Sequence, residues 1–485
     1  MAACAWRWVN EAGRVSVLPG PVHIAPNDLA ADRLRALDVF RGATVALMIL
    51  VNNPGSWAHL YPPLAHADWH GVTPTDLVFP FFLFAVGNAL ALVMPRWLAG
   101  ATGAGRRAFW LRVARRTVLI FVIGLGLNAA PFVRWDAAAA LVPRDWETLR
   151  LMGVLQRIAL AFGGAAVIVA LCSRGAAAAA DTAVVARRVL WAAAGLLLGY
   201  WGLCEVMAQG ADPYSLEGFF GTHLDRAVLG AGHLYRGEGV PFDPEGLAGT
   251  VPAVAQVLLG WWAGQAIAGA YRSAGAPSET TAGARRPGID AALVARLCLA
   301  GVVLGVLAYA WQLQMPLNKK LWTSSYVLHT TALALLGLAA LLALLHAPRH
   351  APRNAPLHEP LHEPLDEPLH EPVSAVARGG IVPLRDRAPL RALLAVCEAF
   401  GRNALGLFVL AGLVPRFLAL WRWPDGVAGD GTPRFISLLP WLYRTVFADL
   451  GSDPRLGSLL FALAHLAVYA LIALWLHRRG WYWRV

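Results

Sequence analysis

The stretch RLRALDVFRGATVALMILVNNPGSWAHLYPPLAHADWHGVTPTDLVFPFFLFAVGN, residues 33–88, decides the fold class. It contains most of two long apolar runs, 36–53 and 74–95, with a polar loop between them. Runs of roughly 20 apolar residues match the length that a helix needs to cross the hydrocarbon core of a bilayer. The stretch therefore predicts two membrane-spanning helices and a connecting loop, 53–73.

The composition of the whole chain agrees with lipid as its main solvent. Of 485 residues, 57% are apolar even without the 47 glycines, and only 15% are charged. Soluble domains reach roughly 45–50% apolar residues only when glycine is counted. These values argue against a water-soluble enzyme. The five cysteines have no spacing typical of a zinc site or a disulfide framework.

Eight further apolar runs extend this pattern along the chain. They show no period-two alternation, and alanine and leucine dominate them, so helices are favoured over strands. We expect an all-α, polytopic integral membrane protein with about ten transmembrane helices in one bundle and no large soluble domain. The further runs are 117–133, 151–172, 189–209, 247–270, 293–311, 321–345, 390–415 and 457–476.

The connecting segments predict the orientation in the membrane. If alternate segments lie on opposite sides, the side that holds the N-terminus carries 26 lysine and arginine residues and the other side carries 12. Cytoplasmic loops hold the excess of basic residues, so both termini are predicted to be cytoplasmic. The net charge of +11 is explained by this asymmetry and implies no nucleic-acid partner.

The domain organisation follows from the apolar runs. Residues 1–32 form a predicted cytoplasmic segment. Residues 33–345 form the predicted membrane core, which includes the loop 53–73 and an external loop, 210–246. A Pro/His/Glu-rich cytoplasmic linker, 346–389, is expected to be disordered, and residues 390–485 form C-terminal transmembrane helices of the same domain.

The linker contains a four-residue repeat, PLHEPLHEPLDEPLHE, at 356–371. His358, His362 and His370 could bind a metal, but prolines at this density are typical of a disordered spacer. We therefore predict no metal site.

Polar residues cluster around the first two spans, where they are costly and so are functional candidates. Asp38 and Arg41 lie at the cytoplasmic end of the first span, and Asn52 ends it. The loop then supplies His66, and Asp76 opens the second span behind Pro74. A histidine near an asparagine has the groups needed for general-base catalysis and for stabilising an oxyanion.

Two of these assignments have simpler alternatives. Asp38 and Arg41 are three residues apart on one helical face, so they form either an ion pair or a contact to a coenzyme. Asp76 could favour a helix N-terminus through the helix dipole, a role that is compatible with catalysis.

Several motifs in this order resemble the heparan-α-glucosaminide N-acetyltransferase family, including its bacterial members, among the transmembrane acyltransferases. The resemblance extends from about Arg33 to the C-terminus. The motifs are LDVFRG (37–42), VN (51–52), HADWHGVTPTDLVFP (66–80), GVLQRIA (153–159), FDPEG (242–246) and NKKLWTSSYVL (318–328), with a looser match at GRNAL (401–405).

The resemblance implies a reaction and a set of site residues. It implies that acetyl-CoA is the co-substrate, donating its acetyl group from the cytoplasmic side to the amine of a glucosamine-type sugar on the external face. It further implies a bacterial cytoplasmic (inner) membrane protein without a metal, and a homodimer is left open. The implied catalytic residues are His66, Asn52 and Asp76. The implied cofactor-binding residues are Asp38, Arg41, Gln156, Arg157, Asn318 and Lys319, and the substrate-binding residues are Trp57, Trp69, Asp243 and Glu245.

Alternatives remain open at the level of mechanism and of function. His66 either deprotonates the amine during direct transfer or carries the acetyl group in a two-step path. A chain of this kind could also be an amino-sugar transporter or an O-acyltransferase that acts on a cell-envelope glycan.

Overall fold

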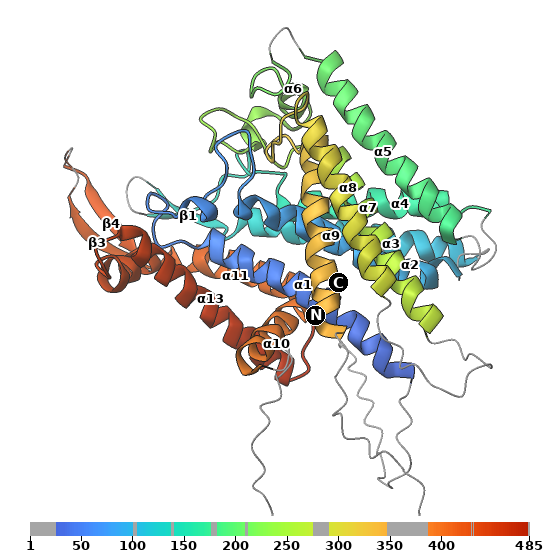
Figure 1. The fold of residues 1–485 in the computed structure, drawn as a ribbon. Coiled ribbons are helices and arrows are strands. Elements are labelled where there is room, and N and C mark those ends of the chain that lie inside the picture. Colours follow the sequence, from blue (N-terminus) through green and yellow to red (C-terminus); the bar gives the residue numbers. More distant parts are fainter. Residues whose placement is uncertain are drawn as a thin grey trace, which may run out of the picture.

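The computed structural model is largely helical, and it describes residues 26–99, 104–136, 140–175, 182–208, 212–274, 291–346, 387–427, 429 and 431–483. Nine of the ten predicted spans coincide with one helix each, the tenth coincides with two, and the helices form one bundle (Figure 1). The expected all-α, polytopic membrane fold is thus confirmed. The helices are α1 (Pro26–Asn52), α2 (Val78–Ala99), α3 (Ala104–Ala129), α4 (Val154–Cys172), α5 (Thr182–Val206), α7 (Thr250–Ala274), α8 (Ala291–Trp311), α9 (Ser324–His346), α10 (Ala388–Arg402), α11 (Ala404–Leu418) and α13 (Pro454–Arg478).

The number of helices apolar enough to cross a membrane is smaller than the ten that we expected. Within the described residues, seven helices qualify by length and composition, or eight if α10 and α11 count as one broken span. The helices α1 and α3 do not qualify, because charged residues occupy much of their length. Arg35, Asp38 and Arg41 leave only the last part of α1 free of charge, and five arginines do the same in α3.

The span predicted at 390–415 is not continuous. The helices α10 and α11 meet at an angle of 84° around Asn403. The side chain of Asn403 forms two hydrogen bonds with the C-terminal segment. Its Nδ2 donates to the carbonyl of Trp481, and its Oδ1 accepts from the N–H of Trp483, both at 3.0 Å. These tertiary contacts explain a break that the apolar pattern does not reveal.

The helices α2 and α7 form the centre of the bundle. In α7, 83% of the apolar stretch is buried inside the protein, whereas α8 and α13 bury only 22% and can face lipid. Glycines allow the central contact: a Cβ atom at Gly87 would lie 2.1 Å from the carbonyl oxygen of Val257, and one at Gly260 would lie 2.2 Å from that of Phe84. Small residues at such contacts let two helix backbones approach closely.

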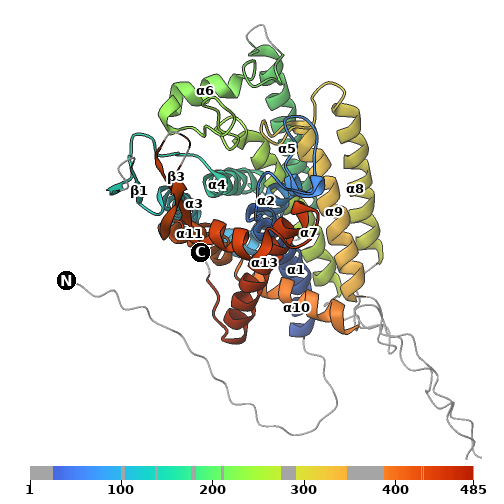
Figure 2. The same ribbon diagram turned by 90° about the vertical axis from the view of Figure 1, so that its left-hand side faces the viewer.

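The remaining elements lie in the connecting segments. The predicted external loop 210–246 contains α6 (Phe220–Leu229) and the short 3-10 turn η4 (Ala231–His233). Two hairpins, β1–β2 (Val133–Trp135, Leu141–Pro143) and β3–β4 (Arg422–Val427, Pro433–Ser437), lie side by side (Figure 2). The guanidinium of Arg422 joins them, 4.1 Å from the ring centre of Trp135 and 4.2 Å from that of Phe435. The chain continues through α12 (Leu438–Leu442) and the π-helical turn η6 (Tyr443–Phe447) to α13.

The two ends of the bundle carry different parts of the predicted site. Asp38 in the first half of α1 lies near Arg402, which in turn contacts Tyr482 after α13. Asn52 and the loop 53–73 are at the opposite end of α1. The orientation of these ends in the membrane stays a prediction. Most of the 1–32 segment and of the 346–389 linker, including the whole repeat, lies outside the described residues.

The close contact between α2 and α7 can be tested by adding a single methyl group. Gly87→Ala is expected to lower the unfolding temperature of the purified protein in detergent, because overpacking costs about 1–3 kcal/mol. Gly199→Ala is the matched control, since nothing lies within 4 Å of a Cβ atom at Gly199 in α5. Alanine at Gly199 should leave the unfolding temperature unchanged or raise it slightly. Equal unfolding temperatures for all three proteins would contradict the proposed packing.

Candidate active site

The carboxylate of Asp76 is the centre of the candidate site. Asp76 belongs to a 3-10 turn, η2 (Pro74–Leu77), that continues directly into α2, and its side chain is 1% exposed. Its Oδ2 accepts hydrogen bonds from the backbone N–H groups of Ala67 and Thr73, both at 3.1 Å. Thr73 caps the same turn in return. The helix-start role of Asp76 is therefore present, and it anchors the loop 53–73 to the bundle.

The other oxygen of this carboxylate contacts His66. Oδ1 of Asp76 lies 2.7 Å from Nδ1 of His66. An ionised carboxylate only accepts hydrogen bonds, so the shared hydrogen is assigned to Nδ1. In the neutral ring Nε2 then carries the free lone pair. The side chain of His66 is 41% exposed, which leaves the ring accessible to a ligand.

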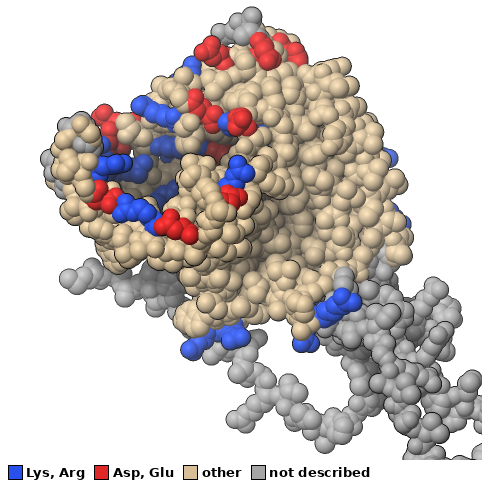
Figure 3. All heavy atoms as spheres, turned by 60° about the vertical axis from the view of Figure 1, so that its left-hand side comes forward, with Lys and Arg blue, Asp and Glu red and all other residues tan. Residues whose placement is uncertain are grey.

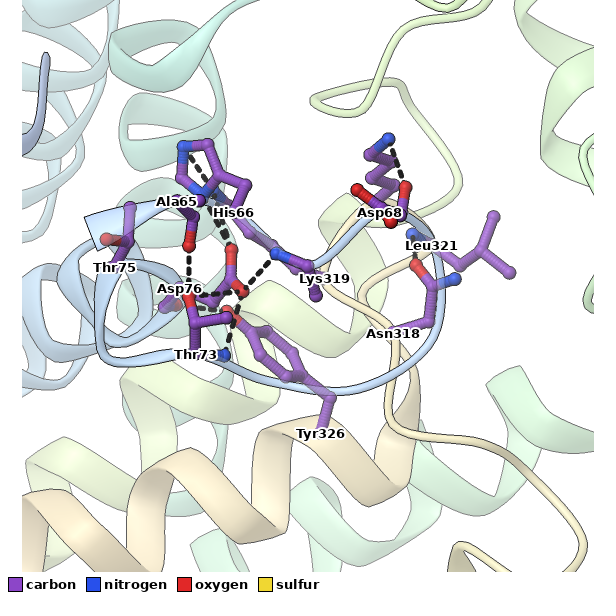
Figure 4. Close-up of polar contacts among 12 residues, drawn as sticks. Ala65, His66, Asp68, Thr73, Thr75, Asp76, Asn318, Lys319, Leu321 and Tyr326 are labelled. Carbon is purple, nitrogen blue, oxygen red and sulfur yellow. Dashed lines mark hydrogen bonds and ion pairs between the residues drawn. The ribbon is translucent and has the colours of Figure 1, made fainter. Parts of the chain in front are cut away.

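The connection between α8 and α9 adds a cation to this pair. The Nζ atom of Lys319 lies 3.4 Å from Oδ1 of Asp76 and 3.0 Å from Nδ1 of His66. Figure 4 shows His66, Thr73 and Lys319 converging on the Asp76 carboxylate. From α9, the hydroxyl of Tyr326 donates to the backbone carbonyl of Asp76 at 2.6 Å. Two segments that are distant in sequence, the loop before α2 and the connection into α9, therefore meet at Asp76.

Asn318, which precedes this lysine, is buried and shapes the turn. Its Oδ1 accepts a hydrogen bond from the N–H of Leu321 at 2.9 Å, and its backbone N–H donates to the hydroxyl of Thr323 at 3.0 Å. Its Nδ2 lies 3.4 Å from Nδ1 of His70. The structure therefore gives Asn318 a role in fixing the turn that presents Lys319.

A cavity of ≈ 420 Å³ opens beside His66. Its volume is within the range of about 300–1,000 Å³ that is usual for small-molecule sites. Six of its lining residues belong to the predicted site, and others come from the segments around it. The predicted residues on its wall are Asn52, His66, Trp69, Asp76, Glu245 and Lys319.

A second cavity, of ≈ 460 Å³, adjoins the first. The two cavities share Asn52 and Arg150, together with apolar side chains of α1, α4 and α11. Amide side chains line the second cavity, including Asn128 and the predicted Gln156. On the side of the molecule that Figure 3 presents, a hollow opens whose walls carry lysine or arginine atoms.

The two predicted substrate carboxylates are already paired with an arginine. The guanidinium of Arg150 binds Asp243 through two hydrogen bonds of 2.9 and 2.6 Å, and it also contacts Glu245. Asp243 is buried, whereas Glu245 lines the first cavity. Burial alone would lower the pKa of Arg150, but the carboxylates of Glu245 and Asp243 raise it, so the group stays charged.

The residues predicted to bind the coenzyme do not form one site. Arg157 is fully buried: its Nη2 donates to the carbonyl of Gly246 at 2.9 Å, and its guanidinium lies 5.0 Å from the ring centre of Trp322. Gln156 lines the second cavity and donates to the carbonyl of Leu151 at 3.0 Å. Gln156 thus faces a space that a ligand could occupy, and Arg157 does not.

Asp38 and Arg41 lie far from His66. Their side chains form the ion pair that the sequence suggested, and Nε of Arg41 donates to the carbonyl of Gly401 at 2.8 Å. The 11 helical residues from Arg41 to Asn52 correspond to roughly 16 Å along α1. Asp38 and Arg41 can therefore contact only the distal part of an extended ligand whose reactive end is near His66.

The two predicted stacking tryptophans differ in position. Trp69 is on the wall of the first cavity, where its Nε1 donates to the carbonyl of Tyr214 at 2.8 Å and its ring packs on Phe242. Trp57 is 64% exposed and lines neither cavity. Only Trp69 is placed to contact a ligand next to His66.

Three charged residues of the first cavity were not predicted as site residues: Arg150, Glu238 and Lys320. Lys320 joins two loops, because its Nζ lies 2.7 Å both from the carbonyl of Asp68 and from Oε2 of Glu238. Arg150 covers the ring of Tyr235 at 4.8 Å. Only two residues separate Arg150 from the motif GVLQRIA at 153–159. Its partners, Asp243 and Glu245, are more than 90 residues away in sequence, so no local pattern indicates the pairing.

A buried aspartate supports the loop that carries the carboxylates. Oδ1 of Asp225, in α6, accepts from the N–H of Leu247 at 2.8 Å. Burial raises the pKa of Asp225 to about 6, and the nearby Asp243 acts in the same direction. Within the described residues, no group of three or more His, Cys, Asp or Glu side chains is arranged to hold a metal ion.

Comparisons with known proteins agree with the motifs. A family model described as a domain of unknown function, DUF5009, matches residues 33–140, a range that includes His66 and Asp76. A protein from Homo sapiens named heparan-alpha-glucosaminide N-acetyltransferase is 28% identical over 356 residues, which cover 66% of this chain and 50% of that protein. A protein of the same name from Mus musculus is 27% identical over 333 residues, covering 61% and 47%.

The chain spans about half the length of the curated relatives that it matches. These similarities confirm the family resemblance that the motifs indicate. Together with the apolar helices, they identify a multi-pass membrane protein that is similar to acetyltransferases.

The raised pKa of Asp225 predicts how stability depends on pH. The unfolded chain releases this proton near pH 3.8 and the folded protein near pH 6, so stability should fall as the pH rises between these values, by about 3 kcal/mol for this group. Asp225→Asn removes this loss of stability, because asparagine does not titrate. Its side-chain oxygen can still accept the hydrogen bond from the N–H of Leu247. The difference in unfolding temperature between variant and wild type should grow from pH 4 to pH 6.5. Asp145→Asn, in an exposed loop, controls for the loss of one charge, and a parallel course of all three curves would refute the assignment.

Proposed function

We propose that this chain is a transmembrane N-acetyltransferase of a bacterial cytoplasmic membrane. It would move an acetyl group from cytoplasmic acetyl-CoA to the amine of a glucosamine-type sugar on the external face. The observation that carries the proposal is the His66–Asp76 pair in a cavity that meets a second cavity at Asn52. Two adjoining cavities suit a reaction between two substrates, and the similar curated relatives bear the name of an N-acetyltransferase.

In the proposed reaction His66 acts as the general base. The neutral amine of the acceptor attacks the carbonyl carbon of the thioester, so that an N–C bond forms and the carbonyl π electrons move to oxygen. Nε2 of His66 takes a proton from the attacking nitrogen. The C–S bond then breaks, and the imidazolium returns this proton to the leaving sulfur. Asp76 is a positioning residue here, because its bond to Nδ1 leaves Nε2 as the base.

Asn52 is one of the residues that line both cavities, and so it lies where the two substrates would meet. Its amide can donate a hydrogen bond to the thioester oxygen or orient the donor. Holding both reactants at this position also removes much of the entropic cost of bringing them together.

The second cavity is proposed for the arm of the donor. The side-chain NH₂ of Gln156 donates to the carbonyl of Leu151. The side-chain NH₂ of Asn128 donates to the carbonyls of Arg150 and Met152. These side chains therefore keep their oxygens available to accept hydrogen bonds from the amide N–H groups of a pantetheine chain. Arg41 and Asp38 border a small cavity of ≈ 70 Å³ at the other end of α1, where a distal group of the donor could bind.

The first cavity is proposed for the acceptor sugar. Trp69 offers an aromatic edge, and Glu245 with Arg150 offers hydrogen-bonding groups on the same wall. Because Asp243 is buried and bound by Arg150, we assign it to holding this arginine and not to direct sugar contact. We assign no sugar contact to Trp57, because it lies outside both cavities.

One assay separates this proposal from its alternatives. Protein reconstituted in vesicles is given labelled acetyl-CoA on one side and a set of amino sugars on the other. N-acetylated sugar is the expected product, O-acetylated glycan would indicate the O-acyltransferase, and accumulation of unmodified sugar would indicate a transporter. His66→Ala and Asn52→Ala should each reduce kcat by at least about 10²-fold. Full activity in both variants would reject the site.

The same preparation distinguishes direct transfer from a two-step path. In direct transfer no acetyl label stays on the protein when the acceptor is absent. Label that is retained under these conditions, and lost in His66→Ala, would establish an acetyl-histidine intermediate instead.

The role of Asp76 is tested by Asp76→Asn. An asparagine can donate to Nδ1, which would favour the tautomer that has its hydrogen on Nε2 and is no longer a base there. We expect kcat to fall by about 10²–10⁴-fold with a small change in KM for either substrate. Unfolding temperature is measured in parallel, because Asp76 also caps η2. An unchanged kcat in a folded variant would show that the carboxylate does not act through His66.

A further inference from the structure

Lys319 stands against the imidazole of His66 in an orientation that is not an ordinary hydrogen bond. Its Nζ is 3.0 Å from Nδ1 and 3.4 Å from Nε2. The two ring nitrogens flank Cε1, so an ammonium in the ring plane at these distances from both would overlap with that carbon. Nearly equal distances therefore place the ammonium over the face of the ring.

The hydrogen bond of Nδ1 supports this interpretation. Nδ1 donates its hydrogen to Asp76, and a lysine ammonium has no lone pair to accept one. Lys319 is consequently bound through its charge to Asp76, 3.4 Å away, and not through a shared proton with Nδ1. Its remaining N–H groups are free to point into the first cavity, whose wall it forms.

The turn that presents Lys319 is held in a strained conformation. Trp322 has a φ of +56°, which is uncommon for any residue other than glycine and costly for a bulky one. Its ring is buried between Arg157, at 5.0 Å, and Phe79, at 4.7 Å. Backbone strain of this kind persists only when surrounding contacts enforce it, and it is concentrated at functional sites. The buried Arg157 thus packs against the residue that holds this strained conformation.

The neighbouring lysine, Lys320, has its ammonium held by different partners. The Nζ of Lys320 has two close oxygen partners, the carbonyl of Asp68 and the carboxylate of Glu238. Lys319 has one carboxylate in contact and its side chain is 20% exposed to the cavity. The charged groups around it are Asp76, Glu245 and Lys320, with His66 beneath it.

We propose that Lys319 is a catalytic residue that donates an N–H hydrogen bond to the carbonyl oxygen of the acyl donor as it becomes an oxyanion. The inference rests on the proposed acetyl transfer and deepens it. The acceptor's amine nitrogen gives its proton to Nε2 of His66 and bonds to the carbonyl carbon of the thioester. The carbonyl oxygen is therefore only two bonds from this nitrogen. Since Nζ is 3.4 Å from Nε2, this oxygen falls within reach of the ammonium. No proton transfer from Lys319 is required.

The charge state of Lys319 gives the role a pH signature. Burial lowers the pKa of Lys319 from its ordinary value, although Asp76 and Glu245 act in the opposite direction. Activity should therefore decline at alkaline pH as the ammonium loses its proton.

Two substitutions at Lys319 test the inference. Lys319→Met keeps a similar shape without charge and should lower kcat by about 10²–10³-fold, because the lost contact exists mainly in the transition state. The affinity for a non-hydrolysable acetyl-CoA thioether should change less than threefold. Lys319→Arg should recover at least a tenth of kcat and lose the alkaline decline, since a guanidinium stays charged.

A purely structural role for Lys319, as counter-ion of Asp76, predicts a different result. In that case Lys319→Met would lower the unfolding temperature, and any folded fraction would keep its kcat and its alkaline decline. Lys320→Met is the matched control, for which we expect lower stability but an unchanged alkaline limb. If the wild type acetylates an acceptor and folded Lys319→Met keeps its kcat, this inference is wrong while the proposed function stands.

A second measurement does not depend on activity. Lys319 and Lys320 are the only lysines of the chain. In a Lys320→Arg variant, an amine-selective acylating reagent can therefore modify one lysine side chain only, and mass spectrometry of that peptide gives its rate. The rate should rise with pH around a midpoint below the ordinary lysine value of about 10.4, and Asp76→Asn should lower this midpoint further. A midpoint at or above the ordinary value would refute the buried, charged lysine that the inference needs.

Discussion

A carboxylate at the mouth of an apolar bundle must be compensated, and the site is organised around that requirement at Asp76. Transferring a carboxylate out of water is expensive unless hydrogen bonds and an opposite charge replace the lost hydration. Two backbone N–H groups, a histidine and a lysine provide this compensation. The histidine and both N–H groups come from the loop 53–73, which directly precedes Asp76, and the lysine comes from the distant α8–α9 connection. The carboxylate thus holds these two segments together.

The same principle applies to the neighbouring charges. Asp243 and Glu245 lie beside the bundle because Arg150 binds both, and Arg157 is buried because it holds the carbonyl of Gly246 and packs on Trp322. Such groups are costly to bury alone and are tolerated as paired sets. The consequence is an end of the bundle held together by ion pairs, in which two cavities share Asn52 and Arg150. The proposed transfer between two substrates needs such fixed contacts, because the reacting atoms must be held in position.

The helices themselves were predictable from the sequence. Apolar runs at 74–95 and 293–311 end within a few residues of α2 and α8, because lipid requires every backbone group to be bonded inside the helix. The pattern could not show that the run 390–415 breaks at Asn403. That bend depends on Trp481 and Trp483, about 80 residues away, which occupy the amide of Asn403. The apolar parts of α1 and α3 likewise suggested simple spans, but the charged residues in the rest of each helix keep both from qualifying.

The sequence by itself determined the helical membrane class, the order of the helices, and the residue types His66, Asn52 and Asp76, because hydropathy and local motifs are written along the chain. Only the tertiary structure decided which polar groups meet. In the structure His66 binds Asp76, and Asp243 binds Arg150. Arg157, predicted as a ligand contact, is buried against Trp322 in a strained turn. Lys319 lies over an imidazole that is 253 residues away in sequence. The physical reason is that electrostatic compensation is a matter of distance in space, and separation along the chain carries no record of it.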